Sequence, residues 1–379
     1  MTNKTYIPRY LEKIIENWLF KDMVIILYGA RRVGKTTMVQ NLAQKYGDKA
    51  AYYNCDLSEV RRVLESQDPV TMKNYIGEKT LLIFDEAQQV REIGLSLKLL
   101  HDTFPKIQII ATGSSSFDLA NKVGEPLTGR SLTFKLYPFS VSELSEMYNR
   151  FEIGSQINSF LIYGLYPAVV LSDVASRALF LQNLADNYLY KDVLAFENLK
   201  RPDLLLDLLK VVALQVGSEV SVHELAVRLK CGTKTIERYL DLLEKSFVIF
   251  RLRPFSRNLR NEIGKKVKVF FYDLGVRNAI IDRFADLDKR DDIGALWENF
   301  CVAERMKINQ QKGISGSTYF WRNHAGQEVD YLEESNGKIT AFEFKWAKDK
   351  YRAPKEFLQE YNVPEVKLIN KDNLFDFVL

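Results

Sequence analysis

Three short, largely apolar segments lie in the first 115 residues, and small or polar residues follow each of them. The segments span 23–28, 80–84 and 106–111. Apolar segments of this length are typical of strands that are buried on both faces of a parallel sheet. A helical pattern opens at Thr37, shortly after the first segment. We therefore expect an α/β domain in which the carboxyl ends of the strands carry the chemistry.

The loop after the first segment has the spacing G-x-x-x-x-G-K-T, which suits the binding of nucleotide phosphates. Between a strand and a helix, its backbone N–H groups point into one concavity at the positive end of the helix dipole. Lys35 is then expected to reach the β- and γ-phosphates, and the hydroxyl of Thr36 to bind Mg²⁺. The residues expected to contact ATP are Gly29, Ala30, Arg31, Arg32, Val33, Gly34, Lys35, Thr36 and Thr37.

Polar residues at the ends of the next two segments are candidates for the chemistry of hydrolysis. Asp85 is expected to help hold Mg²⁺, and Glu86 to polarise the attacking water. Thr112 or Ser114 would sense the γ-phosphate, or would only cap the following helix. Further along, Arg130 is either an arginine finger, acting in cis or on a neighbouring subunit, or an ordinary surface arginine.

Four motifs in order carry a resemblance that extends from about Tyr6 to Leu144. They are LYGARRVGKTT, LLIFDEAQ, IIATGSSS and LTGRSLTFKLYPFSVSEL. This part of the chain resembles the AAA-type P-loop ATPases found in many bacterial and archaeal genomes. The resemblance implies a domain with an ASCE-type parallel sheet. Such a domain hydrolyses ATP with Mg²⁺ and changes conformation as it does so.

The middle of the chain predicts a helical region, followed over about 217–271 by a winged helix. Residues 151–217 have apolar positions three and four apart, as in packed helices. The expected elements of the winged helix are a short helix with a capping box at Ser221 and Glu224, a turn at 231–232, a helix over 233–245, and strands over 247–252 and 268–271.

Basic residues on the second of these helices are candidates for contacts with DNA phosphates. The first candidates are Lys234 and Arg238, followed by Lys245 and by Lys265, Lys266 and Lys268 near the wing. However, Glu237, Asp241 and Glu244 lie on the same helix and weaken its positive field. DNA binding and a purely structural winged helix are both open interpretations.

Near the C-terminus, a hairpin pattern brings carboxylates together. Asn336-Gly337 is a favoured two-residue turn and predicts that positions whose numbers sum to 673 lie opposite each other. Asp330 then faces Glu343, and Glu328 faces Lys345, all on one polar face. The apolar residues expected on the other face are Val329, Tyr331, Phe342, Phe344 and Trp346.

Two interpretations of this polar face are open. A divalent cation would relieve the repulsion between the carboxylates, with Glu298 as a further ligand and Lys345 positioned to act on water. Alternatively, the face is solvated and Glu328 forms a cross-strand salt bridge with Lys345.

The arrangement resembles the PD-(D/E)xK nuclease-like fold, which is a restriction-endonuclease-like α/β domain. Glu298 matches its helical acid, Asp330 its first strand acid, and Glu343 and Lys345 its E-x-K signature, while Val329 replaces the proline. Together with FFYDLGVRNAI, GALWENFCVAE and EVDYLEE, these residues resemble the domain that accompanies this ATPase type, the combination AAA_14 plus DUF4143. The resemblance implies a nuclease site at Glu298, Asp330, Glu343 and Lys345.

Length and composition limit the function further. The 379 residues predict a P-loop domain over 1–150, a helical and winged-helix region over 151–271, and a nuclease-like domain over 272–379. Three cysteines and three histidines, all widely spaced, argue against disulfides and zinc. The absence of a long apolar run or a signal-peptide pattern predicts a cytoplasmic protein, and a net charge of +4 allows nucleic-acid binding without indicating it.

Two functions are therefore expected from the sequence. The first is a Mg²⁺-dependent ATPase that gates DNA binding or cleavage by its C-terminal parts. The alternative is a nucleotide-switched signalling or scaffold ATPase whose nuclease-like domain is inactive. ATP and Mg²⁺ are the expected ligands, DNA is a possible partner, and a homo-oligomer or a protein partner is compatible with both functions.

Overall fold

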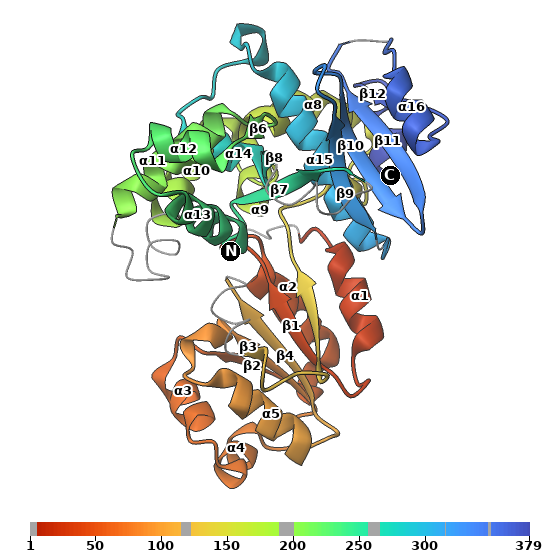
Figure 1. The fold of residues 1–379 in the computed structure, drawn as a ribbon. Helices are drawn as coiled ribbons and strands as arrows, with labels where there is room; N and C mark the ends of the chain where they lie inside the picture. Colours follow the sequence, from red (N-terminus) through yellow and green to blue (C-terminus); the bar gives the residue numbers. More distant parts are fainter. Residues whose placement is uncertain (1–5, 115–122, 189–200, 257–265, 315, 348–349) are drawn as a thin grey trace. The chain divides into compact units, whose positions relative to one another are not determined.

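The computed structural model describes residues 6–114, 123–188, 201–256, 266–314, 316–347 and 350–379. These residues form two compact units, each with its own sheet (Figure 1). The first unit contains residues 1–139 and 245–247, and the second contains 140–244 and 248–379.

The first unit is built on a sheet of five parallel strands in the order β2-β3-β4-β1-β5. The strands are β1 (Val24–Tyr28), β2 (Ala50–Asn54), β3 (Leu81–Asp85), β4 (Gln108–Gly113) and β5 (Ser131–Lys135). β1, β3 and β4 are buried at every position, as the continuous apolar segments predict. The predicted α/β class with a parallel sheet is confirmed.

Helices connect these parallel strands, and α3, α4 and α5 pack together as a group (Figure 1). The helices of the first unit are α1 (Tyr10–Trp18), α2 (Lys35–Tyr46), α3 (Ser58–Glu65), α4 (Pro69–Ile76) and α5 (Ile93–Thr103). Helix α2 follows β1 after the loop of residues 29–34, so the predicted order of strand, loop and helix is present.

The second unit begins with a helical region and ends with a mixed α/β region. Its helices are α7 (Val141–Leu144), α8 (Arg150–Tyr163), α9 (Pro167–Val170), α10 (Val174–Tyr188), α11 (Pro202–Leu214), α12 (Val222–Arg228), α13 (Thr233–Lys245), α14 (Leu274–Ile280), α15 (Ile293–Gln311), α16 (Lys355–Tyr361) and α17 (Leu374–Val378). The hydroxyl of Ser221 caps α12 by accepting a hydrogen bond from the backbone N–H of Glu224, which is one of the two hydrogen bonds of the predicted capping box. Among the described residues, none of these helices combines the length and apolar character needed to cross a membrane.

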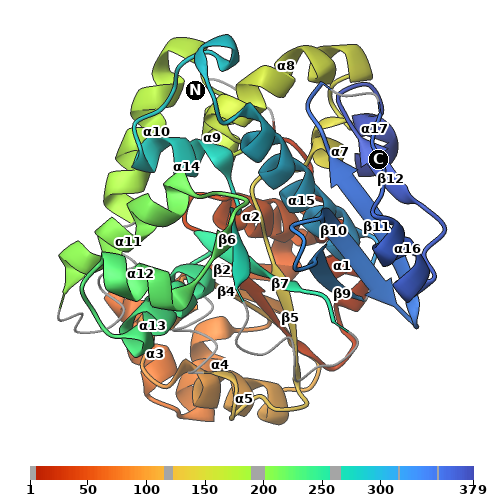
Figure 2. The same cartoon turned by 45° about the horizontal axis from the view of Figure 1, so that its top comes forward.

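A single sheet of seven strands spans most of this unit, in the order β12-β11-β10-β9-β7-β8-β6. The strands are β6 (Glu219–Val220), β7 (Ile249–Pro254), β8 (Val267–Phe271), β9 (Ser317–Arg322), β10 (Glu328–Ser335), β11 (Lys338–Phe344) and β12 (Val366–Ile369). β7 pairs with β8 on one side and, in parallel, with β9 on the other (Figure 2). The expected domain boundary between 271 and 272 therefore falls inside one continuous sheet, which corrects the three-domain division.

The predicted register of the C-terminal hairpin is present, and so is part of its predicted apolar face, since Tyr331 lies beside Phe342 and Phe344. Tyr331 lies opposite Phe342 and Ser335 opposite Lys338, as the turn at Asn336-Gly337 predicts. A bulge between Val329 and Leu332 in the pairing with β9 changes which side chains share a face.

Both faces of the hairpin are consequently covered by apolar side chains. Val329 and Leu332 belong to a buried cluster that includes Phe357 of α16. Tyr331 instead lies beside Phe344, which packs edge-on against Phe377 of α17. The expectation that Val329 and Tyr331 share one apolar face is wrong, because the bulge moves Val329 to the side of Leu332.

Candidate nucleotide site and buried acid cluster

The loop between β1 and α2 has the backbone geometry of a phosphate-binding loop. Gly34 has φ 101°, a conformation that glycine adopts without strain. A Cβ atom on Gly29 would lie 2.4 Å from the carbonyl oxygen of Leu136, so the close approach of these two segments requires glycine there. Both glycines of the motif are thus explained by backbone geometry in the first unit.

The side chain of Lys35 is folded against this loop. It is 4% exposed, and its Nζ atom donates hydrogen bonds to the carbonyl oxygens of Gly29 (2.8 Å) and Ala30 (3.0 Å). Its ammonium group therefore lies within the loop that the sequence predicts for phosphates.

Asp85, at the carboxyl end of β3, is the centre of a group of hydroxyl donors. It is buried and accepts hydrogen bonds from the hydroxyls of Thr36 (2.7 Å) and Tyr52 (2.7 Å), and from that of Thr112. These bonds stabilise a carboxylate that burial alone would disfavour. The structure thus brings Thr36, Asp85 and Thr112 together, as expected from the sequence, and adds Tyr52 of β2.

Glu86 begins a second network at the same edge of the sheet. Its backbone is in the left-handed region (φ 54°), and its N–H donates to the hydroxyl of Thr112 (3.2 Å). The side-chain amide of Gln88 donates both to Glu86 (2.5 Å) and to the hydroxyl of Ser114 (3.2 Å). Gln88 was not identified from the sequence, although its position two residues after Glu86 places it beside the predicted site.

Arg130 lies at the amino ends of the parallel strands, opposite the carboxyl ends that carry Asp85 and Thr112. It directly precedes β5, and its carbonyl oxygen accepts a hydrogen bond from the N–H of Val24, at the start of β1 (2.8 Å). Its guanidinium group pairs with Asp102 (3.0 Å). Because Lys35 and Asp85 lie past the carboxyl ends of the strands, the structure does not bring Arg130 to them. Among the interpretations left open for Arg130, this position favours a surface arginine or action on a neighbouring subunit over action in cis.

The second unit contains a buried group of charges, which we call the acid cluster: Glu298, Glu328, Asp330 and Glu343 with Lys268 and Lys345. Carboxylate oxygens of Glu298, Glu328 and Asp330 lie within 4.8 Å of one another. Glu298 comes from α15 and the other two from β10. This proximity agrees with the predicted placement of Glu298 near Asp330.

Lys268 is the unexpected member of the acid cluster. Its side chain is 2% exposed, and Nζ lies 2.6 Å from Glu298, 3.8 Å from Asp330 and in direct contact with Glu328. Burial alone would lower the pKa of Lys268, but the surrounding carboxylates outweigh it and hold the pKa well above its usual range. The expectation that Lys268 contacts DNA from the wing is therefore wrong. Lys268, rather than Lys345, is also the lysine that pairs with Glu328.

Lys345 occupies the other side of the cluster, where it pairs with Glu343 (2.5 Å) and Asp330 (3.7 Å). Asp330 also accepts a hydrogen bond from the N–H of Phe344 (2.9 Å). The Oε2 atom of Glu343 is buried and has no hydrogen-bond partner in the described part of the chain. The nearby hydroxyl of Tyr351 has a single proton, which it donates to the carbonyl oxygen of Glu328 (3.0 Å).

The acid cluster contains four carboxylates but two lysines. This excess of negative charge affects the protonation of the carboxylates. Burial raises the pKa of Glu298 to about 8 and that of Glu343 to about 7. Nearby Asp330 adds to both shifts through charge repulsion, while the lysines oppose them. At the exposed rim, Arg322 lies 3.6 Å from Glu328 and supplies a further positive charge.

The predicted DNA-binding residues Lys234 and Arg238 are both exposed on α13. Two of the acidic residues on this helix, Asp241 and Glu244, pair with Arg251 of β7, which reduces their effect on the field of the helix. Lys266 lies 3.7 Å from Glu224, and Lys265 lies outside the described residues. The helices and strands expected for a winged helix are present, and DNA contact by this region stays a prediction.

Three parts of the chain match known protein-family models. Residues 21–145 match the family model of an AAA domain. This range contains the phosphate loop, Asp85, Glu86, Thr112 and Ser114. Residues 154–287 and 293–375 match two domains of unknown function, DUF8612 and DUF4143. The DUF8612 range holds Lys268 and the DUF4143 range holds the other members of the acid cluster.

Curated relatives cover most of the chain at low identity. An uncharacterised protein of Haemophilus influenzae is 25% identical over 298 residues, which cover 72% of this chain and 73% of that protein. The uncharacterised protein MJ1637 of Methanocaldococcus jannaschii is 25% identical over 345 residues, covering 80% of this chain and 72% of the relative.

Two similar solved structures are those of the Aeropyrum pernix ORC1 protein in complex with DNA and of Bacteroides sp Pif1 in complex with ADP-AlF4. The first is 13% identical with a TM-score of 0.31, and covers 74% of this chain and 93% of that chain. The second is 14% identical with a TM-score of 0.25, and covers 50% of this chain and 52% of that chain. The assignment of the AAA domain thus depends on the family model and on the geometry of the loop and of Asp85.

Proposed function

We propose that the AAA domain binds ATP with Mg²⁺ and hydrolyses it. The observation that carries the proposal is the convergence of Lys35, Thr36 and Asp85 at one edge of a parallel sheet. The Thr36 hydroxyl bonds to Asp85 at 2.7 Å, and the Lys35 ammonium lies within the glycine loop. A lysine, a hydroxyl and a carboxylate at these positions form the donor set that a magnesium nucleotide requires.

In this proposal each residue has a separate role. The N–H groups of the loop and Lys35 bind the phosphates, and Thr36 with Asp85 would hold Mg²⁺, which neutralises phosphate charge. Glu86 orients the attacking water and accepts its proton as oxygen bonds to the γ-phosphorus and ADP departs. Gln88 holds the carboxylate of Glu86, and Ser114 holds Gln88, so these two residues position the base.

The test compares nucleotide binding with phosphate release in three variants. Lys35→Ala is expected to weaken ATP binding by at least about tenfold because it removes the cation of the loop. Glu86→Gln is expected to keep binding but to lose hydrolysis by about 10²–10⁴-fold, the usual contribution of a positioned base. Lys45→Ala, on the same helix but 48% exposed, is the matched control and should behave as wild type. Hydrolysis by Glu86→Gln at the wild-type rate would contradict the proposed base.

For the second unit we propose a second function, divalent-cation-dependent cleavage of DNA by the acid cluster. The buried Oε2 atom of Glu343 supports it. Among the described residues no donor is aligned with this atom, and the neighbouring hydroxyl of Tyr351 donates to Glu328, so a bound ligand would satisfy it. Glu298, Asp330 and Glu343 would hold the cation, which would stabilise charge on a phosphodiester. Lys345, the more exposed of the two cluster lysines, would position the water.

The alternative is a scaffold in which Lys268 neutralises the carboxylates in place of a metal ion. Incubation of the protein with DNA, ATP and Mg²⁺ or Mn²⁺ separates the two functions. If the cluster cleaves DNA, Asp330→Asn and Glu343→Gln abolish nicking, whereas Glu360→Gln, an exposed acid on α16, leaves it unchanged. If wild type and Asp330→Asn nick DNA equally, the activity comes from a contaminant. The proposed cleavage function is then wrong, and the scaffold function stands.

A further inference from the structure

A cavity lies in the helical part of the second unit, and its lining shares no residue with either candidate site. It is lined by residues of α8, α9 and α10 and by the segment between α7 and α8, and its volume is about 400 Å³. Cavities that bind small molecules measure roughly 300–1,000 Å³. The cavity is therefore large enough for a ligand.

Apolar side chains form the wall and the rim of this cavity. Phe160 and Val169 are buried in the wall, with Val170 beside them. At the rim, Phe151 is 86% exposed and Tyr148 is 39% exposed. Exposed aromatic side chains beside a cavity are typical of ligand sites, where they cover the apolar part of the ligand.

One end of the cavity carries the positive charge of Arg177, which has no carboxylate partner among the described residues. The guanidinium group of Arg177 donates to the hydroxyl of Ser159 (2.6 Å) and, through two nitrogens, to the carbonyl oxygen of Ser172 (3.4 Å each). A guanidinium has five N–H groups, so further donors remain. Within the described part of the chain, Arg177 forms no ion pair.

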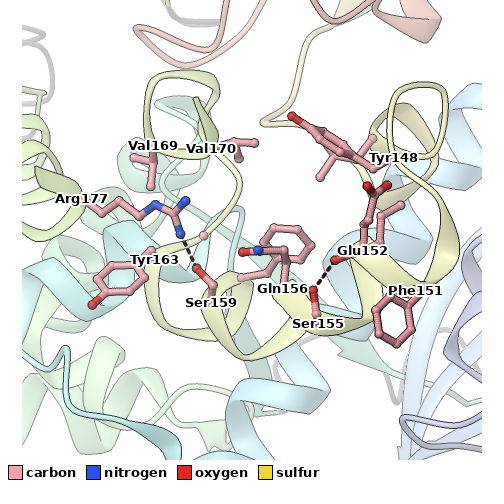
Figure 3. A pocket seen from close by; sticks show the side chains of 14 residues that line it. Tyr148, Phe151, Glu152, Ser155, Gln156, Ser159, Tyr163, Val169, Val170 and Arg177 are labelled. Carbon is pink, nitrogen blue, oxygen red and sulfur yellow. Dashed lines mark hydrogen bonds between the residues drawn. The ribbon is translucent and has the colours of Figure 1, made fainter. Parts of the chain in front are cut away.

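The polar groups are distributed unevenly over the cavity. Figure 3 shows Arg177, Ser159 and Tyr163 at one end, and Tyr148, Phe151 and Glu152 at the other. Glu152 is engaged in capping α8, since it accepts a hydrogen bond from the N–H of Asn149 (2.8 Å). A ligand that reaches both ends would therefore be anionic only at the end beside Arg177.

We propose that this cavity binds a carboxylate carried on an apolar group. The carboxylate pairs with Arg177, whose planar donors match its two oxygens, and the hydroxyl of Ser159 stays beside it. The apolar group lies against Phe160, Val169 and Val170. The carboxylate of Glu152 at the far end disfavours a second negative charge, which distinguishes this ligand from nucleotides.

The first experiment measures binding of octanoate to the full chain by titration calorimetry, beside octanamide, which has the same apolar chain and no charge. Octanoate is expected to saturate one site, and octanamide to bind at least about tenfold more weakly, since it forms no ion pair with Arg177. Equal binding of the two probes overturns the proposal, as does the absence of saturable binding by both octanoate and the peptide described below.

Two variants locate the site. Arg177→Gln is expected to weaken octanoate binding by at least about tenfold, whereas Arg150→Gln, an exposed arginine at the start of α8, leaves it unchanged. Because Arg177 also bonds to Ser159 and Ser172, Val170→Trp serves as a second variant, which fills the cavity and keeps the arginine. Full octanoate binding by Val170→Trp overturns the location.

The carboxylate has two possible sources, a free acid or the C-terminus of a peptide with an apolar last residue. A tripeptide that ends in leucine is compared with the same peptide amidated at its C-terminus. Tighter binding of the free peptide than of octanoate, with loss of binding on amidation, identifies a chain terminus. Binding of octanoate alone identifies a small acid, and binding of neither ligand overturns the proposal.

Discussion

At the scale of single residues, Asp292 illustrates how the second unit keeps buried cations. Its carboxylate lies 2.6 Å from Arg277 and 2.8 Å from Arg290, both of which are buried. Asp292→Asn removes the charge that compensates both guanidinium groups. We therefore expect the free energy of unfolding to fall by about 3 kcal/mol, which denaturant titration at pH 7 measures. The control is Asp291→Asn, whose 84% exposed carboxylate pairs with Arg283 at the surface, so its change should stay below about 1 kcal/mol.

The same residue gives a pH dependence with a definite sign. Burial alone would raise the pKa of Asp292, but hydrogen bonds from Arg290 and Arg277 outweigh it and hold the pKa well below its ordinary 3.8. The folded state thus binds the proton less tightly than the unfolded state, and the contribution is present above about pH 4 and lost as pH falls. The difference in stability between wild type and Asp292→Asn should narrow between pH 7 and pH 3. A constant difference would contradict the ion-pair explanation.

At the scale of elements, the junction of α8 and α14 depends on one glycine. Gly164 ends α8 with φ 71°, and a Cβ atom there would lie 2.1 Å from the carboxylate of Asp273. That carboxylate caps α14 and also accepts from the N–H of Leu165 (2.7 Å). Gly164→Ala should lower the free energy of unfolding by at least about 2 kcal/mol, through strain and loss of the cap. Gly154→Ala is the opposite case, because no atom lies closer than 4.0 Å to the added Cβ. This variant should raise the free energy of unfolding by about 0.5–1 kcal/mol.

The sequence predicts local elements well and distant contacts poorly, and particular residues show why. β1, β3 and β4, the cap at Ser221 and the register at Asn336-Gly337 all follow from neighbouring residues. Lys268 lies on β8, 30 residues before Glu298 of α15, so no local pattern places it in the acid cluster. The bulge at Val329 depends on pairing with β9, and Tyr52 reaches Asp85 only because β2 pairs with β3.

At the scale of the whole molecule, two compact units imply that a ligand of one unit acts first on the stability of that unit. ATP at 100 times its dissociation constant should stabilise the AAA domain by about 2.7 kcal/mol. Calorimetric scans with and without magnesium nucleotide measure this shift. Lys35→Ala should reduce it to about 1.4 kcal/mol or less, because tenfold weaker binding leaves ATP at about 10 times its dissociation constant. Asp292→Asn, in the second unit, should leave the shift in place, because sites in separate units that share no partner residues contribute independently. An equal shift in wild type and Lys35→Ala would contradict binding at the phosphate loop.

The position of Lys268 on β8 has a practical consequence for experiments on fragments of the chain. A fragment that begins at residue 293, where the match to DUF4143 starts, would contain the four carboxylates of the acid cluster. Of the two lysines of the cluster, it would contain only Lys345. It would also leave the edge of β9 without its neighbour β7. Such a piece is expected to take up cations more readily than the intact protein, and to associate through its open strand. Metal binding measured on it would therefore report the missing lysine rather than the preference of the native cluster.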